Sequence, residues 1–176
     1  RHSPKSGKTH DLIDIPLKNT DGSISKLAIS RDITAFKRTE NALRESEKFL
    51  KKSQEMAHIG SWKLDLRKND LLWSDEVYRI FGLNPREFGA TLDVFFEAVH
   101  PDDRKMVDQA YKTAVENHEP YDITHRVLRP DGTVRIVHEK SEEILDESGK
   151  AVLSIGMIHD ITERSRAAAS LKDTMD

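Results

Sequence analysis

The chain has 176 residues, a formal net charge of −3 and no cysteine, and 34% of its residues are charged. The absence of cysteine excludes a disulfide framework, a cysteine-based zinc site and thiol chemistry. Charges of both signs are mixed along the chain, so the composition gives no reason to expect a nucleic-acid partner. No stretch reaches the roughly 20 apolar residues that a membrane span requires.

A β-hairpin is predicted first. Its strands run from Leu12 to Leu17 and from Ile24 to Ile33, and a turn at Asn19-Thr20-Asp21-Gly22 joins them. This hairpin has no helices of its own to cover it. We therefore interpret residues 1–33 as the C-terminal strands of a truncated upstream domain.

The pattern becomes helical from Thr34 to Ala57, with Thr34 as the predicted N-cap. Apolar residues recur every seven positions along this helix, at Phe36, Leu43, Leu50 and Ala57. The positions three residues later are small hydroxyl residues, where a two-stranded coiled coil would prefer apolar side chains. Two interpretations stay open: an amphipathic connector that packs on its own sheet, and a dimeric signalling helix with a weak seam.

A complete α+β domain is predicted for residues 59–162, with five strands and with helices between the second and third strands. The predicted strands span about Trp62–Arg67, Asn69–Trp73, Tyr121–Arg129, Thr133–Leu145 and Ala151–Ile161. The predicted helices are one capped by Ser74, one from about Leu92 to Val99, and one from Pro101 to about Glu116.

The tripeptide Asp-Ile-Thr occurs twice, at Asp32-Ile33-Thr34 and at Asp160-Ile161-Thr162, 128 residues apart. Each copy follows a turn and an apolar strand and precedes a charged helix, so the repeat has the length of one small domain. Five further motifs precede the second copy in order: Ile59-Gly60-Ser61-Trp62, Trp73-Ser74-Asp75-Glu76, Phe81-Gly82-Leu83, His100-Pro101-Asp102-Asp103-Arg104 and His125-Arg126-Val127-Leu128-Arg129-Pro130-Asp131-Gly132.

As an ordered set these motifs resemble a PAS domain of the sensory-box type, in full over about residues 46–165 and in part over residues 1–33. The resemblance implies a five-stranded antiparallel sheet with helices on one face, flanked by a long N-terminal and a short C-terminal signalling helix. The expected divisions are a truncated upstream PAS domain (1–33), a connecting signalling helix (34–58), a complete PAS domain (59–162) and the start of an exit helix (163–176).

The resemblance also implies a function. We expect a cytoplasmic sensor or relay module, without enzymatic activity of its own, from a multidomain signalling protein such as a sensor histidine kinase or a diguanylate cyclase. We expect an output domain in cis and a homodimer formed through the signalling helix and the remnant hairpin. The alternative is a constitutive dimerisation module with a filled core and no ligand.

Signal coupling is expected where each last strand meets the following helix. The candidate coupling residues are Asp32, Thr34, Asp160, Ile161 and Thr162. Gly156 is expected on the outward face of its strand, where a helix or a second protomer would pack closely.

Two histidines are expected to face each other inside the sheet. A two-residue turn at Asp131-Gly132 would place His125 opposite His138, where two imidazoles suit a metal, an anion, a pH sensor or a purely structural pair. The candidate pocket residues are Trp62, Phe95, Tyr111, His125, Ile136, His138 and Met157.

No haem, flavin or metal is predicted, because the helix from Pro101 to Glu116 has no histidine and there is no cysteine. A small metabolite of unknown identity stays open as a ligand. His100 and His118 are interpreted as residues that begin and end that helix.

Overall fold

The computed structural model describes residues 2–3, 7–117 and 119–173. The chain divides into two compact units, Arg1–Lys51 and Lys52–Asp176, and each is described by itself. None of the helices in the described residues is both long and apolar enough to cross a membrane.

The first unit is a small antiparallel sheet followed by a helix. Its strands are β1 (His2–Ser3), β2 (Lys8–Lys18) and β3 (Ile24–Asp32). The predicted hairpin is confirmed, with a turn that Gly22 closes by donating to the carbonyl of Asn19 over 3.0 Å at a φ of 86°. Helix α1 (Thr34–Ala57) begins and ends where the sequence predicts, and none of its residues is buried.

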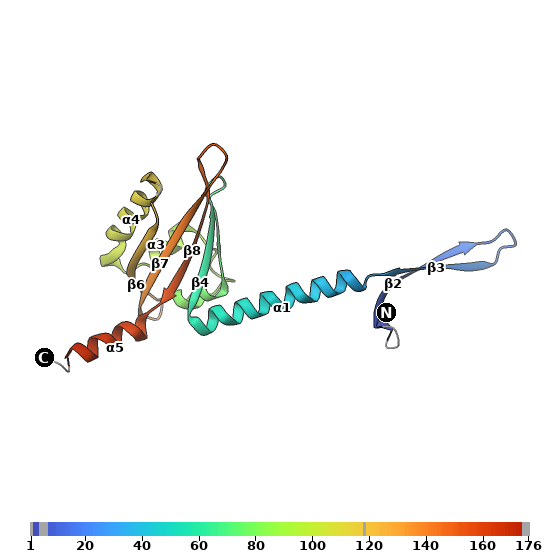
Figure 1. Ribbon diagram of the computed structural model, residues 1–176, viewed down its shortest axis with the longest axis horizontal. Coiled ribbons are helices and arrows are strands. Elements are labelled where there is room, and N and C mark those ends of the chain that lie inside the picture. Colours follow the sequence, from blue (N-terminus) through green and yellow to red (C-terminus); the bar gives the residue numbers. More distant parts are fainter. Residues whose placement is uncertain (1, 4–6, 118, 174–176) are drawn as a thin grey trace. The chain divides into compact units, whose positions relative to one another are not determined.

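The second unit is an α+β domain built on a five-stranded antiparallel sheet in the order β5-β4-β8-β7-β6 (Figure 1). Its strands are β4 (Ile59–Asp65), β5 (Asp70–Trp73), β6 (Tyr121–Leu128), β7 (Val134–Leu145) and β8 (Ala151–Asp160). Its helices are α2 (Asp75–Phe81), α3 (Leu92–Ala98), the 3₁₀ turn η1 (Pro101–Asp103), α4 (Arg104–Asn117) and α5 (Thr162–Asp173). The predicted fold class is confirmed.

Helices α2, α3 and α4 cover one face of the sheet, which we call the inner face (Figure 1). The core lies between this face and the helices, and its buried side chains alternate along each strand. The strands contribute Leu64, Val127, Val137 and Ile158, and the helices contribute Val77, Phe81, Phe95 and Val107.

The hairpin of β6 and β7 has a register that differs from the prediction by one residue. His125 pairs with Val137, and His138 pairs with Thr124. The loop has three residues, closed by Gly132 in the left-handed conformation at a φ of 81°, not the two residues that were assumed. A slip of one residue exchanges the two faces of a strand, so the predicted pairing of His125 with His138 is wrong.

Two helix starts use their polar side chains differently from each other. Ser74 stands at the N-cap of α2, but its hydroxyl accepts from the amide of Ser61 over 3.0 Å and makes no bond to the helix. His100 caps η1 as predicted, with Nδ1 accepting from the amide of Asp102 over 3.4 Å. The predicted role of His118 lies outside the described residues.

The two repeats share one hydrogen-bond register. Counted back from the two Asp-Ile-Thr copies, the pair Ile13–Ile29 of the hairpin corresponds to the pair Lys140–Met157 of the complete domain. In the complete domain this pair lies on the outer face, opposite the helices. The corresponding face of the hairpin is apolar and exposed, and it carries Ile13, Ile15, Leu17, Leu27 and Ile29.

Candidate functional site

The end of β8 is tied to β7 by a compact hydrogen-bond network. The hydroxyl of Thr162 accepts from the amide of Ile136 over 2.9 Å and donates to Oδ1 of Asp160. The amide of Ile161 donates to the carbonyl of Ile136 over 2.9 Å. Thr162 is only 1% exposed, so water cannot replace these partners. Three of the predicted coupling residues, Asp160, Ile161 and Thr162, therefore lie together where β8 ends and α5 begins.

The first Asp-Ile-Thr copy forms the same network. The hydroxyl of Thr34 accepts from the amide of Thr9 over 2.9 Å and donates to Asp32, and the amide of Ile33 donates to the carbonyl of Thr9. The hydroxyl and the amide of Thr34, helped by Lys8, lower the pKa of Asp32 to about 2. Asp32 thus stays ionised near neutral pH.

In each Asp-Ile-Thr network the aspartate also pairs with a basic residue, which lies on the first strand of the hairpin. Lys8 Nζ lies 3.4 Å from Asp32 Oδ2, and Arg135 Nη1 lies 3.5 Å from Asp160 Oδ2. The repeat therefore extends beyond the tripeptide to a distant cation that the sequence comparison did not single out.

The predicted N-cap role of Thr34 is wrong, and Thr162 is not the N-cap of its helix either. Each helix makes its first backbone bond to the isoleucine carbonyl, from Lys37 to Ile33 and from Ser165 to Ile161. The preceding aspartate accepts from the threonine amide, over 3.0 Å in both copies. The aspartate therefore satisfies a free amide of the first turn, while the threonine hydroxyl turns back to the sheet.

The incoming helix reaches this junction as well. The amide of Asp160 donates to the carbonyl of His58, the residue after α1, over 3.0 Å. His58 has a φ of 53°, which a non-glycine residue rarely adopts. Arg79 of α2 pairs with Glu55 at 3.6 Å and with the buried Glu76 at 2.5 Å, so α2 holds the last turn of α1 beside the sheet.

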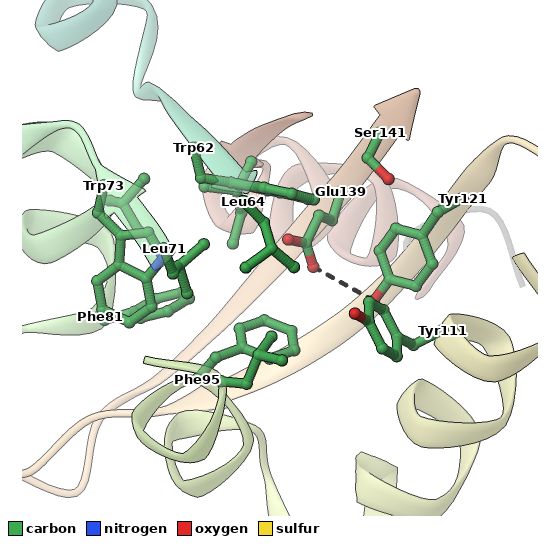
Figure 2. Close-up of a pocket in the computed structure, with 13 residues that line it drawn as sticks. Trp62, Leu64, Leu71, Trp73, Phe81, Phe95, Tyr111, Tyr121, Glu139 and Ser141 are labelled. Atoms are coloured by element: carbon green, nitrogen blue, oxygen red, sulfur yellow. Dashed lines mark hydrogen bonds between the residues drawn. The ribbon is translucent and has the colours of Figure 1, made fainter. Parts of the chain in front are cut away.

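A small cavity, partly open to solvent, lies between the inner face of the sheet and the helices, with a volume of about 30 Å³. Six of its 13 lining residues are aromatic, and Figure 2 shows them: Trp62, Trp73, Phe81, Phe95, Tyr111 and Tyr121. A water molecule needs about 10–15 Å³ of such space. The resting cavity therefore has room for about two waters.

One end of this cavity is polar. Glu139 of β7 is 3% exposed, and its Oε2 accepts from the Tyr121 hydroxyl over 3.3 Å and lies 3.2 Å from Nε2 of His125. Nδ1 of His125 faces the carbonyl of Arg126 at 3.3 Å. Burial and the Glu139 carboxylate raise the pKa of Tyr121 well above its ordinary value, so this hydroxyl remains a donor.

The predicted pocket residues divide by strand face. Trp62, Phe95 and Tyr111 line the cavity, and His125 lies behind it, with its ring edge-on to Phe95 at 6.0 Å. Three candidates lie on the outer face, because successive side chains of a strand point to opposite faces of the sheet and these positions alternate with the inward-facing ones: Ile136, His138 and Met157.

His138 instead bonds Asp122 on the outer face, over 2.6 Å. The prediction for Gly156 is wrong in the opposite sense, because it expected this residue on the outer face. A Cβ there would lie 2.5 Å from Trp62 Cε2, so Gly156 is on the inner face beneath the indole. Glu139 was missed, although with the correct register its position next to Tyr121 and His125 follows directly.

The described residues contain no group of three or more histidine, cysteine or acidic side chains placed to hold a metal ion.

With this fold and geometry in view, comparison with known proteins defines the class. The family model of the PAS fold matches residues 70–158, half of the chain, and the chain therefore belongs to the PAS fold family.

The similar curated proteins are sensors and signalling enzymes. The probable diguanylate cyclase DgcE of Escherichia coli is 24% identical over 84% of this chain and 13% of its own length. Sensor protein FixL of Bradyrhizobium diazoefficiens is 30% identical over 65% of this chain and 22% of its own. The blue-light-activated histidine kinase of Brucella ovis is 31% identical over 66% and 23%. The chain thus spans less than a quarter of each relative.

Solved structures agree on the fold. A sensory box histidine kinase/response regulator from Burkholderia thailandensis superposes with a TM-score of 0.58 at 25% identity, over 72% of this chain and 94% of that one. The N-terminal domain of a diguanylate cyclase with PAS/PAC sensor from Marinobacter aquaeolei gives a TM-score of 0.56 at 18% identity, over 61% and 98%. The second likeness supports the fold alone.

Proposed function

We propose that this chain is a sensory relay segment of a larger signalling protein, in which the complete PAS domain passes a change in its packing to α5 and on to an output domain. The observation that carries the proposal is the network of Asp160, Ile161 and Thr162. It joins the last strand, its neighbour β7 and the first turn of α5 through buried bonds. A shift of β7 relative to β8 must therefore move the start of α5 or break these bonds.

The incoming helix shares this junction. The Asp160 amide donates to the carbonyl of His58. A rotation of the last turn of α1 would therefore act on Asp160, the residue at which β8 leads into α5. The domain would then integrate two inputs, one from its interior and one from the preceding helix. Residues 1–33, with their own Asp-Ile-Thr network, would be the last strands of an upstream PAS domain that feeds α1.

We further propose that the chain works as a homodimer. Phe36, Leu43 and Leu50 recur at heptad spacing and are 60–67% exposed. A parallel pair of α1 helices would bury this stripe, and the small hydroxyls between its members would keep the seam weak. The exposed apolar face of the hairpin would add to the contact with the second copy.

A ligand-free dimerisation module is the second candidate. The cavity volume of about 30 Å³ favours it, because a bound metabolite of ordinary size would need the helices to move. The two candidates share the fold and the dimer and differ in whether the interior controls output.

The proposed relay is tested by fusing the chain, in helical phase after α5, to the kinase core of a histidine kinase and measuring autophosphorylation. Asp160→Asn and Thr162→Val should each change the kinase rate severalfold, and Asp131→Asn, in the exposed hairpin turn, serves as the matched control. Rates that are unchanged in both junction variants would exclude the relay role.

A further inference from the structure

One edge of the five-stranded sheet is open along part of its length. Strand β6 is the outermost strand on that side of the sheet, and it pairs with β7. On its other side, the amide of Arg126 donates to Oδ2 of Asp103 over 2.8 Å, and the carbonyl of Arg126 accepts from the amide of His100 over 2.9 Å. The backbone groups of Arg126 therefore face away from β7.

The alternation of an antiparallel ladder extends this result along the strand. Every second residue of β6 presents its N–H and C=O to the same side as Arg126, so Asp122 and Thr124 do so as well. Both residues are exposed, and among the described residues neither has a backbone partner on that side. The open part of the edge therefore offers two donors and two acceptors at the spacing of a β-strand.

The chain itself begins to cover this edge and then leaves it. Val99 forms an isolated antiparallel bridge with Val127, and the turn η1, which begins at Pro101, ends this pairing. A strand that continued the line of the bridge would run antiparallel to β6. It would meet the open backbone groups of Thr124 and then those of Asp122.

A groove of about 500 Å³ lies beside the open part of the edge, between β6 and α4 (Figure 1). Its helical side includes Met106, Ala110 and Ala114, which are four residues apart and share one face of α4. Its strand side includes Tyr121 and Ile123. Among the described lining residues, Tyr121 is the one that this groove shares with the cavity on the inner face, so the two spaces are distinct.

The groove selects half of the side chains of an added strand. Successive side chains of a strand point to opposite faces of the sheet, so the side chain opposite Ile123 would point to the inner face, where α4 lies. There it would contact Met106 and Ala110, and it has to be apolar. The side chains on either side of it would lie on the outer face.

The charge of the groove selects the remaining side chains. The charged residues that line it, Glu119 and Asp122, are both acidic. Asp122 pairs with Lys140 at 2.7 Å, and Glu119 is exposed. A basic side chain opposite Asp122 is therefore favoured, and an acidic one is repelled. A second copy of β6 would bring the same two carboxylates to the contact, so charge disfavours the pairing of this edge with itself.

We infer that the open edge of β6 is a docking site for an extended segment of a partner protein, which adds to the sheet as an antiparallel strand. The segment alternates apolar residues, directed into the groove, with polar ones, and it carries a basic residue opposite Asp122. Main-chain hydrogen bonds at Asp122 and Thr124 supply the affinity, and the groove supplies the specificity. The site does not include the Asp160 junction, so the inference stands independently of the relay.

A short peptide tests the inference on the full chain: acetyl-Val-Thr-Val-Lys-Val-amide, whose lysine lies opposite Asp122 in the antiparallel register. The readout is the ¹H–¹⁵N NMR signal of the Asp122 and Thr124 amides, which donate to the added strand. Both signals should shift saturably. A peptide with glutamate in place of lysine should bind at least threefold more weakly.

Two N-methylated forms of the peptide separate strand addition from simple apolar contact. Methylation of the threonine and lysine nitrogens removes the two donors that face β6 and should weaken binding at least tenfold. Methylation of the second and third valine nitrogens, which face away from β6, is the matched control and should leave the affinity within threefold.

Variants of the protein test the same contacts from the other side. Thr124→Pro removes one open donor, and because this N–H faces away from β7, the ladder between β6 and β7 stays intact. Ala110→Leu fills the groove. Each should weaken peptide binding at least tenfold, whereas Val115→Leu, on the same helix outside the groove lining, should bind within threefold of the parent. If Thr124→Pro does not fold, the two N-methylated peptides on the parent chain decide the matter.

Equal affinities of the two N-methylated peptides would overturn strand addition. The absence of a saturable shift with the unmodified peptide would show that the edge does not take such a strand. Self-association of the parent chain that Thr124→Pro abolishes would mean that a second copy covers the edge, and the assignment to a partner protein would then be wrong.

Discussion

The amide of Asp160, the last residue of β8, donates a hydrogen bond to the carbonyl of His58, the residue that follows α1, over 3.0 Å. The chain therefore enters and leaves the complete domain at adjacent backbone groups, although these two residues are 102 positions apart in sequence. Residues next to this bond should affect stability and signalling together, and residues elsewhere in the sheet should affect stability alone.

Thr162→Val keeps the shape of the side chain and removes the hydroxyl. The buried amide of Ile136 then loses its acceptor, and we expect the free energy of unfolding to fall by about 1–3 kcal/mol. Urea denaturation followed by circular dichroism measures the loss. Thr162→Ser keeps the hydroxyl and should cost clearly less. Equal losses in the two variants would mean that the hydroxyl contributes nothing.

Gly156→Ala places a methyl group 2.5 Å from two carbons of the Trp62 ring and 2.6 Å from the carbonyl of Lys140. The indole has to move, so we expect a loss of about 1–3 kcal/mol and a changed tryptophan emission spectrum. Gly89→Ala is the matched control, because no atom lies within 4 Å of its added Cβ. Its stability should stay within about 0.5 kcal/mol of the parent. A Gly156→Ala protein with parental stability and emission would contradict the packing described.

Asp103 links η1 to β6, with the Arg126 guanidinium and amide bonded to its carboxylate at 2.6–3.0 Å. The Arg126 guanidinium lowers the pKa of Asp103. A carboxyl whose folded pKa is lowered stabilises the fold fully above its unfolded pKa of about 3.9. This stabilisation is lost as the pH falls through the folded value.

Asp103→Asn should therefore lower stability at pH 7 by about 1 kcal/mol, a modest value because the Arg126 side chain is 40% exposed and water screens the pair. The difference from the parent should shrink between about pH 4 and pH 2 in urea titrations at each pH. Asp102→Asn is the control. Its side chain is 72% exposed, and it should change little. If the difference in unfolding free energy between Asp103→Asn and the parent stayed constant with pH, the ionic contribution would be ruled out.

Leu43→Glu places a charge in the centre of the exposed stripe of α1 and should weaken self-association at least tenfold in sedimentation equilibrium. Arg38→Glu introduces the same residue about 140° around the helix, since successive residues turn by about 100°. It should leave association nearly unchanged. A parent chain that is monomeric at high micromolar concentration would remove the basis of the proposed dimer.

Most of the fold could be predicted from the sequence, because periodicity and turn residues report directly on local structure. The predicted bounds of helix α1 agree with the structure at both ends, because its heptad pattern is uninterrupted from Thr34 to Ala57. The strands of the complete domain were placed to within a few residues, since apolar and polar positions alternate along them.

The register between β6 and β7 could not be predicted correctly from the sequence. Asp131-Gly132 fits a two-residue turn, but Pro130 belongs to the loop as well, as suits the first central position of a type I turn. Because the loop is one residue longer than predicted, the register shifts by one, so that His138 lies on the outer face and Glu139 on the inner face. The partnership of Glu139 with His125 and Tyr121 depends on this register, and so it was missed.

The common register of the two repeats has an evolutionary consequence. The hairpin and the complete domain share one register up to the bulge between Ile144 and Leu145, yet the position of Lys140 in one is Ile13 in the other. The same backbone ladder therefore carries a charged residue on the outer face of one copy and an apolar residue on the corresponding face of the other. Duplicated domains of this kind can therefore acquire different neighbours while their shared framework stays unchanged.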